Sequence, residues 1–361
     1  MKNKILTRRE FGKITALSAL AWNITPAWAD IGPGTKRIRI AQIGTSHSHA
    51  EEKYQTLTKL SDVFDVIGIV EPNPDYLKKA KPKEEFQDAK WITEEQLMDT
   101  KGLQAVLVET DFKELLPIAL KFAKKGLHVH IDKPPGTSLA DLKKLYKIAK
   151  NQNLIVQMGY MFRYNPAFKF CIDAVKNGLL GNIYQVDGVI SKKIKSSRRT
   201  KLAASYGGSM MLLGCHLIDM LAAVCGKPQE IHSYRKQTYK DNDGLYDNEL
   251  AVFNYPQTTA TIRSSLLEVG GKERRQFVIA GEHGTIEINP LEPPKLRFVL
   301  DKSTDKYSAG RHHIELPQMP GRYDEQLTDF AKQINGEKIS DFSAEHDIIV
   351  HEAVLTACEM N

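Results

Sequence analysis

The fold is decided near the start of the chain, where residues 38–50 read IRIAQIGTSHSHA. The first six residues alternate and then become apolar, which is typical of a central strand. Gly44 follows, and a helical pattern begins after the loop. A buried strand that passes through a glycine turn into a helix predicts the first unit of a parallel sheet.

The next hundred residues repeat this alternation of strand and helix. Further strands are predicted over 63–70, 103–108, 127–131 and 154–158. Helices are predicted from the Asp111-x-x-Glu114 capping pattern to Gly126 and over 139–150. The series predicts an α/β fold that begins with a Rossmann domain, a doubly wound parallel sheet over residues 36–158.

The loop after the first strand departs from the usual phosphate-binding pattern. Such a turn normally reads G-x-G-x-x-G, but here only Gly44 is kept, and Ser46 and His49 occupy the other glycine positions. Glu71 lies at the tip of the second strand, where an acidic residue binds ribose hydroxyls and repels a 2′-phosphate. The pattern therefore favours NAD over NADP, and the alternative for Glu71 is a solvated strand end.

Four histidines in this region invite other interpretations. His47 and His49 are two residues apart, but no Cys or carboxylate stands beside them in sequence, so contact with pyrophosphate is favoured and no metal is predicted. His128 and His130 alternate on a predicted strand, where hydrogen-bonded core or interface histidines are expected.

The second half of the chain has a different pattern. Strands are predicted over 184–190, 250–255, 259–266, 275–280 and 284–288, with a helix over 214–225. This predicts an α+β domain over residues 159–325 with a large, mostly antiparallel open sheet. The tail, residues 326–361, is predicted to form helices that pack back on the first domain.

Length, composition and charge limit the classes of function. The chain has 361 residues, 42% hydrophobic and 26% charged, which excludes a disordered or collagen-like protein. Residues 1–29 combine a charged start containing Thr7-Arg8-Arg9-x-Phe11, a short apolar run and a small-x-small end. This resembles a bacterial twin-arginine signal, and a plain secretory signal is the alternative. It predicts a periplasmic or otherwise exported protein without a membrane span in its mature part.

The signal also explains most of the net charge of +6. Removing residues 1–29 takes away five basic residues and one acidic residue, which leaves +2. No nucleic-acid partner is therefore predicted. A basic stretch remains over 192–201, and it predicts either an acidic sugar ligand or a solvated loop.

Four motifs in order make a specific resemblance possible. They are Asp132-Lys133-Pro134, GYMFRYNP over 159–166, GGSMMLLGCHLID over 207–219 and R-x-F-x-I-x-G-x-x-G-T-I-E over 275–287. Together they resemble the glucose–fructose oxidoreductase, inositol dehydrogenase and rhizopine-catabolism family, abbreviated Gfo/Idh/MocA. The resemblance covers essentially the whole mature chain.

The resemblance implies a role for each matching residue. Lys133 matches a lysine between nicotinamide ribose and substrate, and His216 matches the acid/base histidine. Substrate contacts are implied for Lys133, Tyr160, Arg163 and Asp219. Cofactor contacts are implied for Gly44, Thr45, Ser46, His47, Glu71, Thr110, Asp132, Lys133 and Tyr323. Leu212 departs from the family, which often has Asp four residues before the histidine.

These implications predict an exported enzyme that oxidises a secondary hydroxyl of a sugar or glycoside. Because free NAD is scarce outside the cytoplasm, the cofactor is expected to be tightly bound. The alternatives are a redox-neutral, NAD-dependent glycosidase and a sugar-binding relative without activity. The exposed face of the open sheet predicts a homodimer or homotetramer.

Overall fold

The computed structural model describes residues 37–239 and 243–360. The predicted signal at residues 1–29 lies outside the described residues. Within the described ranges, each helix is too short or too polar to cross a bilayer.

The first sheet has five parallel strands in the order β2-β1-β3-β4-β5. The strands are β1 (Ile38–Ile43), β2 (Phe64–Val70), β3 (Ala105–Val108), β4 (His128–Ile131) and β5 (Val156–Met158). The helices are α1 (Ala50–Lys59), α2 (Pro74–Ala80), α3 (Glu94–Met98), α4 (Leu115–Ala123) and α5 (Leu139–Gln152). Strands β3 and β4 are buried along their whole length, as expected when helices cover both faces of a parallel sheet.

The strand order places a topological switch point beside β1. The chain moves from β1 to β2 on one side and returns to β3 on the other. In sheets of this kind a crevice forms outside the carboxyl ends of the strands at that point. The loops that follow β1, β3 and β4 therefore meet at one edge of the sheet.

The second sheet has eight strands in the order β13-β12-β11-β10-β6-β9-β8-β7. These are β6 (Ile183–Ser191), β7 (Glu230–Lys236), β8 (Asn248–Asn254), β9 (Thr259–Ser265), β10 (Gln276–Gly281), β11 (Gly284–Leu291), β12 (Pro294–Leu300) and β13 (Gly310–Ile314). Only the β6–β9 pair is parallel among these strands. The predicted α/β fold with a parallel sheet and a mostly antiparallel sheet is confirmed.

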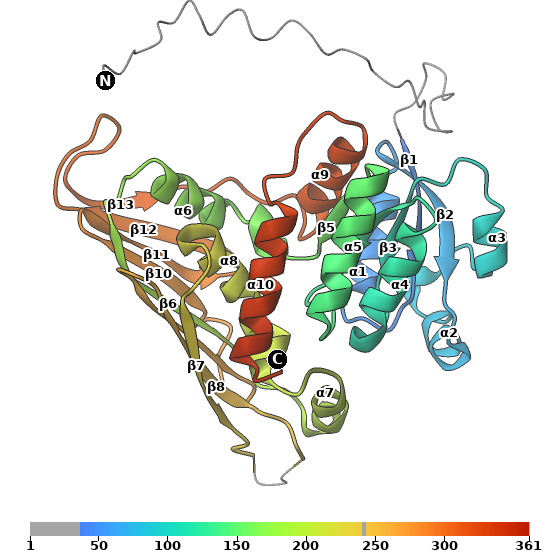
Figure 1. The fold of residues 1–361 in the computed structure, drawn as a ribbon, viewed down its shortest axis with the longest axis horizontal. Helices are drawn as coiled ribbons and strands as arrows, with labels where there is room; N and C mark the ends of the chain where they lie inside the picture. The colour runs from blue at the N-terminus through green and yellow to red at the C-terminus, as the bar shows by residue number, and fades with distance from the viewer. Residues whose placement is uncertain (1–36, 240–242, 361) are drawn as a thin grey trace, which may run out of the picture. The chain divides into compact units, whose positions relative to one another are not determined.

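Helices cover one face of the large sheet (Figure 1). They are α6 (Pro166–Lys176), α8 (Cys215–Cys225) and α10 (Ala344–Ala357). Helix α10 also contacts α5, and α9 (Asp324–Ile334) contacts α1, so both C-terminal helices touch the first sheet's layer. The short helix α7 (Arg199–Tyr206) follows the basic stretch.

Two local expectations differ from the structure. The capping pattern at Asp111 does not form: a 3₁₀ turn over Phe112–Glu114 precedes α4, and the Asp111 carboxylate accepts a hydrogen bond from the Tyr76 hydroxyl instead. The helix containing His216 begins with a π-helical turn over Met210–Gly214. Strands β7, β12 and β13 were not expected from the sequence.

Candidate active site

Gly44 allows the loop after β1 to lie directly against the end of β3. Its φ is +87°, and a Cβ atom placed there would lie 2.5 Å from Thr110 Cγ2 and 2.9 Å from Thr110 Cα. The backbone amide of His47 continues this contact by donating to the Glu109 carbonyl at 3.1 Å. Only glycine fits this conformation and this approach without strain.

Glu71 closes the other side of the loop. Its Oε2 accepts hydrogen bonds from both the backbone amide and the hydroxyl of Thr45, each at 2.7 Å, and its Oε1 accepts from the Asn73 amide at 3.0 Å. The predicted acidic residue therefore lies at the tip of β2 beside the loop, as a ribose-binding position requires.

The loop and strand ends fit the dinucleotide that the fold implies. Helix α1 begins directly after the loop, and no side chain caps its N-terminus at His49. The hydroxyl of Thr110 is buried without a hydrogen-bond partner among the described residues, and Ser46 lines the adjoining cavity. A helix N-terminus and an unpaired hydroxyl are suitable partners for phosphate and ribose oxygens.

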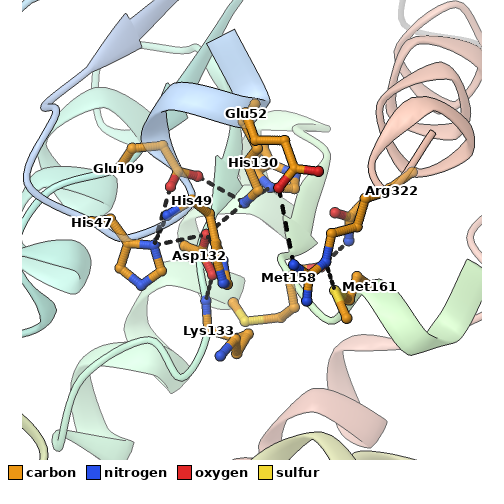
Figure 2. A network of polar contacts seen from close by, with 12 residues as sticks. His47, His49, Glu52, Glu109, His130, Asp132, Lys133, Met158, Met161 and Arg322 are labelled. Carbon is orange, nitrogen blue, oxygen red and sulfur yellow. Dashed lines mark hydrogen bonds and ion pairs between the residues drawn. The ribbon is translucent and has the colours of Figure 1, made fainter. Parts of the chain in front are cut away.

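A buried charge cluster lies beneath this loop, and its centre is a lysine that the sequence did not reveal. Lys53 Nζ donates to Glu109 Oε1 at 2.7 Å and to Asp132 Oδ2 at 2.7 Å, and it lies 2.8 Å from His130 Nε2. All four side chains are fully buried. Figure 2 shows three of them, Glu109, His130 and Asp132, gathered beside His47 and His49. Burial alone would lower the pKa of Lys53, but the two carboxylates outweigh it and raise the pKa, so the ammonium stays charged.

The two loop histidines bind the same carboxylate. His47 Nδ1 lies 3.1 Å and His49 Nδ1 2.9 Å from Asp132 Oδ2, and His47 Nδ1 also lies 3.3 Å from Glu109 Oε2. Burial opposes charge on His47, but Asp132 and Glu109 raise its pKa to about 9. Burial, together with His47 and Lys133, lowers the pKa of His49 to about 3 despite the attraction of Asp132. At neutral pH the loop therefore holds one imidazolium and one neutral imidazole.

These atoms would also suit a metal ion by their spacing. His47, His49 and Asp132 each offer a ligand atom within 4.8 Å of the others. The Lys53 ammonium, however, already bonds to Asp132 and neutralises this cluster of carboxylates. The other two histidines are hydrogen-bonded as expected, with His130 Nδ1 at 2.8 Å from Gln157 Oε1 and His128 Nδ1 accepting from the Ile155 amide.

A cavity of about 560 Å³ opens between the loop and the second sheet. Its lining includes residues from the phosphate loop, from the end of β4, from the π turn and α8, and from the basic stretch. Lys133 and His216 both line it, although they are separated by more than eighty residues in the chain. The structure therefore brings the two residues assigned to catalysis into one cavity.

Lys133 and His216 are both buried in the cavity wall. Lys133 Nζ donates to the Leu212 carbonyl at 3.4 Å, and His216 Nδ1 has no hydrogen-bond partner among the described residues. Burial, and next the charge of Lys133, lower the pKa of His216 well below its usual value. A neutral imidazole beside an ammonium is suited to accept a proton from a hydroxyl.

The π turn before α8 shapes this wall. Gly214 lies so close to Met210 that an added Cβ would be 2.2 Å from its sulfur. Leu212 presents its side chain to the cavity and its carbonyl to Lys133. The position where the family often has Asp therefore contributes a backbone acceptor and apolar surface.

Three residues assigned to substrate binding lie behind the cavity wall. Asp219 is fully buried, and its carboxylate accepts hydrogen bonds from Arg163, at 2.6 Å from Nη2, and lies 3.0 Å from His346 Nε2. Arg163 also pairs with Asp347, and it stacks on the ring of Tyr160 at 5.0 Å. None of Tyr160, Arg163 and Asp219 lines the cavity, and the Arg163–Asp219 pair ties α8 to the segment that follows β5.

Tyr323 lies beside His49 and Lys53 of the buried charge cluster. It immediately precedes α9 and is fully buried, with its hydroxyl unpaired among the described residues. Its ring centroid is 5.7 Å from that of His49 and 5.4 Å from Lys53 Nζ. Neighbouring Arg322 contacts Met161 and Glu52, as Figure 2 shows.

A Rossmann sheet with a dinucleotide loop, joined to a sheet domain through a cavity that holds a lysine and a histidine, defines an NAD(P)-binding oxidoreductase. Comparison with known families agrees. Residues 38–160 match the model of the oxidoreductase family with an NAD-binding Rossmann fold, and residues 168–287 match the GFO/IDH/MocA C-terminal domain. The chain belongs to the Gfo/Idh/MocA family.

The similarity to individual relatives is low in sequence. The chain is 25% identical over 307 residues to myo-inositol 2-dehydrogenase of Thermotoga maritima, an alignment that covers 82% of this chain and 86% of that protein. It is 26% identical to the rhizopine catabolism protein MocA of Rhizobium meliloti, over 40% of this chain and only 44% of that protein.

Solved structures share the fold at low identity. An aldose-aldose oxidoreductase from Caulobacter crescentus, complexed with glycerol, superposes with a TM-score of 0.73 at 18% identity, covering 90% of this chain and 98% of that one. UDP-N-acetylglucosamine 3-dehydrogenase from Acidithiobacillus ferrooxidans gives 0.73 at 15% identity, covering 90% and 97%.

Proposed function

We propose that this protein oxidises a secondary hydroxyl of a sugar or glycoside and passes the hydride to a tightly held NAD. The observation that carries the proposal is the shared cavity of Lys133 and His216, which adjoins the dinucleotide loop. The names of the relatives support a sugar or cyclitol as substrate, since they include an inositol dehydrogenase and an aldose oxidoreductase.

Each of the two residues has a separate task in this reaction. His216 is neutral, because burial and the charge of Lys133 lower its pKa, and from the cavity wall it takes the proton of the hydroxyl that is oxidised. Lys133 keeps a positive charge near the same oxygen and stabilises the developing alkoxide. The bound nicotinamide supplies the hydride acceptor.

The loop residues explain how the nucleotide is retained without the second and third glycines. His47 remains protonated at neutral pH and lines the cavity, so it offers a positive charge to the pyrophosphate where other loops offer backbone amides. Glu71 at the tip of β2 supports NAD over NADP, because its carboxylate would repel a 2′-phosphate.

A redox-neutral cycle is the second candidate. The Thr7-Arg8-Arg9 signal points to export in a folded state, and an exported protein has no pool of free NAD to exchange with. Oxidation of a hydroxyl to a ketone would acidify the neighbouring C–H. Loss of that proton would expel the glycosidic substituent as the free alcohol, water would add to the resulting unsaturated ketone, and return of the hydride would restore the hydroxyl. On the same grounds we propose that the mature protein is periplasmic or otherwise exported, and we expect a homodimer or homotetramer.

Two measurements decide between these candidate functions. Purified protein is denatured, and the supernatant is examined for NAD(H); protein as isolated is then screened with free sugars and glycosides. Nucleotide release with a ketosugar product supports the oxidoreductase, and an aglycone without net redox change supports the glycosidase. Binding without any product, or absence of nucleotide together with no binding of added NAD, would contradict both.

A further inference from the structure

The cavity is strongly basic. Seven Lys or Arg side chains line it, against two carboxylates, those of Asp111 and Glu292. Both carboxylates already have partners: Glu292 lies 3.2 Å from Arg275 Nη1 and 3.3 Å from Arg322 Nη2, and Asp111 lies 3.9 Å from Lys201 Nζ. Most of the positive charge therefore remains without compensation inside the site.

The basic residues divide into two groups by position. Lys201 belongs to the nucleotide side, because its ammonium lies beside Asp111 and 5.4 Å from the ring of Tyr76 on α2. Lys192 and Lys272 belong to the second sheet, one directly after β6 and the other on the turn before β10. A phosphate of the cofactor would engage the first group, and the second group is left for the substrate.

The turn that carries Lys272 is fixed against the end of β6. Gly271 approaches Ser191 so closely that an added Cβ would be 3.0 Å from its carbonyl carbon and oxygen. Arg275 Nε donates to the same Ser191 carbonyl at 3.2 Å. These contacts hold the turn and Arg275 against the end of β6, and the charges of Arg275 and of the exposed Lys272 both act on Lys192.

Neither lysine of this group has a carboxylate within ion-pair distance among residues 37–239 and 243–360. The charges also repel one another: burial, followed by Lys133, Arg198, Arg275 and Lys272, lowers the pKa of Lys192 to about 8. Concentrating cations in a partly buried wall is unfavourable unless an anion occupies it.

We propose that the substrate is a sugar with an anionic substituent, a carboxylate or a sulfate, which Lys192, Lys272 and Arg275 bind while the reacting hydroxyl faces His216. This inference rests on the proposed function and specifies the substrate class of the same cavity. Oxyanion groups are the ligands that clustered Lys and Arg side chains recognise most strongly.

The test is a calorimetric titration of the mature protein with its bound nucleotide. The ligands are D-glucuronate, a monosulfated glucose and D-glucose, so the two anionic arms identify which group is preferred. We expect at least one anionic sugar to bind roughly tenfold or more tightly than glucose. Lys192→Met should remove most of that preference. Lys193→Met is the matched control, because Lys193 is exposed, does not line the cavity and should change nothing.

Equal affinity for the three sugars, binding of none of them, or a preference that survives Lys192→Met would overturn the inference. Nucleotide release on denaturation is measured on the same samples. Released NAD(H) without a preference for anions contradicts only the substrate class, whereas absence of nucleotide contradicts the proposed function itself.

Discussion

The two walls of the cavity differ in whether their charged side chains are paired. Beneath the loop that forms the wall from the parallel sheet, Lys53 is fully buried between Glu109 and Asp132, and each charge has a partner at about hydrogen-bond distance. In the wall from the large sheet, Lys192 and Lys272 face the cavity without an acidic partner among the described residues. The paired charges around Lys53 stabilise the loop, whereas the unpaired Lys192 and Lys272 are available to bind an anionic ligand. Changes in the first wall should cost stability, and changes in the second should cost affinity or turnover.

The largest effect is expected from the second wall. His216→Gln should lower turnover by roughly 10²–10⁴-fold, the usual contribution of a positioned acid/base group. Its unfolding free energy should change little, because Nδ1 of His216 has no partner to lose. Rates are measured by product formation, and stability by urea unfolding. Turnover of His216→Gln at the wild-type rate would show that His216 is not the acid/base group.

The next effect is on stability in the first wall. Lys53→Met leaves two buried carboxylates with His47 as their one remaining cation among the described residues, which should lower the unfolding free energy by about 3–5 kcal/mol. Lys59→Met on the same helix is the control, since Lys59 is more than half exposed and its pair with Asp324 is worth at most about 1 kcal/mol. Similar losses for both variants in urea unfolding would show that the buried cluster does not hold the wall.

A smaller effect is expected where the loop touches β3. Gly44→Ala forces a side chain into a left-handed conformation and against Thr110, at a cost of about 1–3 kcal/mol. The displaced loop should also release the nucleotide, measured as NAD(H) per protein chain after purification. Gly178 also has a positive φ, but a Cβ atom added there would meet open space. Gly178→Ala is therefore the control and should retain the nucleotide. Full occupancy in Gly44→Ala would show that the loop does not bind it.

The smallest effect is a pH dependence. The folded pKa of His47 is raised to about 9 from 6.5, so its stabilising contribution is complete below pH 6.5 and is lost as pH rises through 9. Wild-type Tm should fall over this interval by about 2–4 °C more than that of His47→Gln. Parallel Tm profiles for the two proteins would contradict a charged His47.

The sequence predicted the parts of the site that follow from local order. Gly44 and Glu71 each come directly after a strand, and the rule for parallel sheets places such residues at one edge. Lys133 was assigned by its match to the family's motif. The sequence did not predict that Lys53 and Glu109 belong to the site. Lys53 nevertheless lies one helical turn after His49, a spacing that places both on one helix face.

Tertiary contacts explain why some residues that were assigned to substrate binding do not line the cavity. The family resemblance implied that Asp219, which lies one turn after His216 on α8, contacts substrate. In the structure, Arg163 from the segment after β5 and His346 from α10 occupy its carboxylate. Partners so distant in sequence leave no local signal. For the same reason the parallel β6–β9 pair inside an otherwise antiparallel sheet could not be anticipated.

The central claim is that the cavity passes a hydride from a sugar to a nucleotide that the protein keeps. The most direct measurement is the near-ultraviolet absorbance of the protein as isolated, mixed with D-glucuronate, with a monosulfated glucose or with an uncharged sugar and without added NAD. We expect reduced nicotinamide to appear with at least one of these sugars, at no more than one equivalent per chain, and not to appear with His216→Gln. An unchanged spectrum with every sugar, in protein shown to contain oxidised NAD, would contradict it.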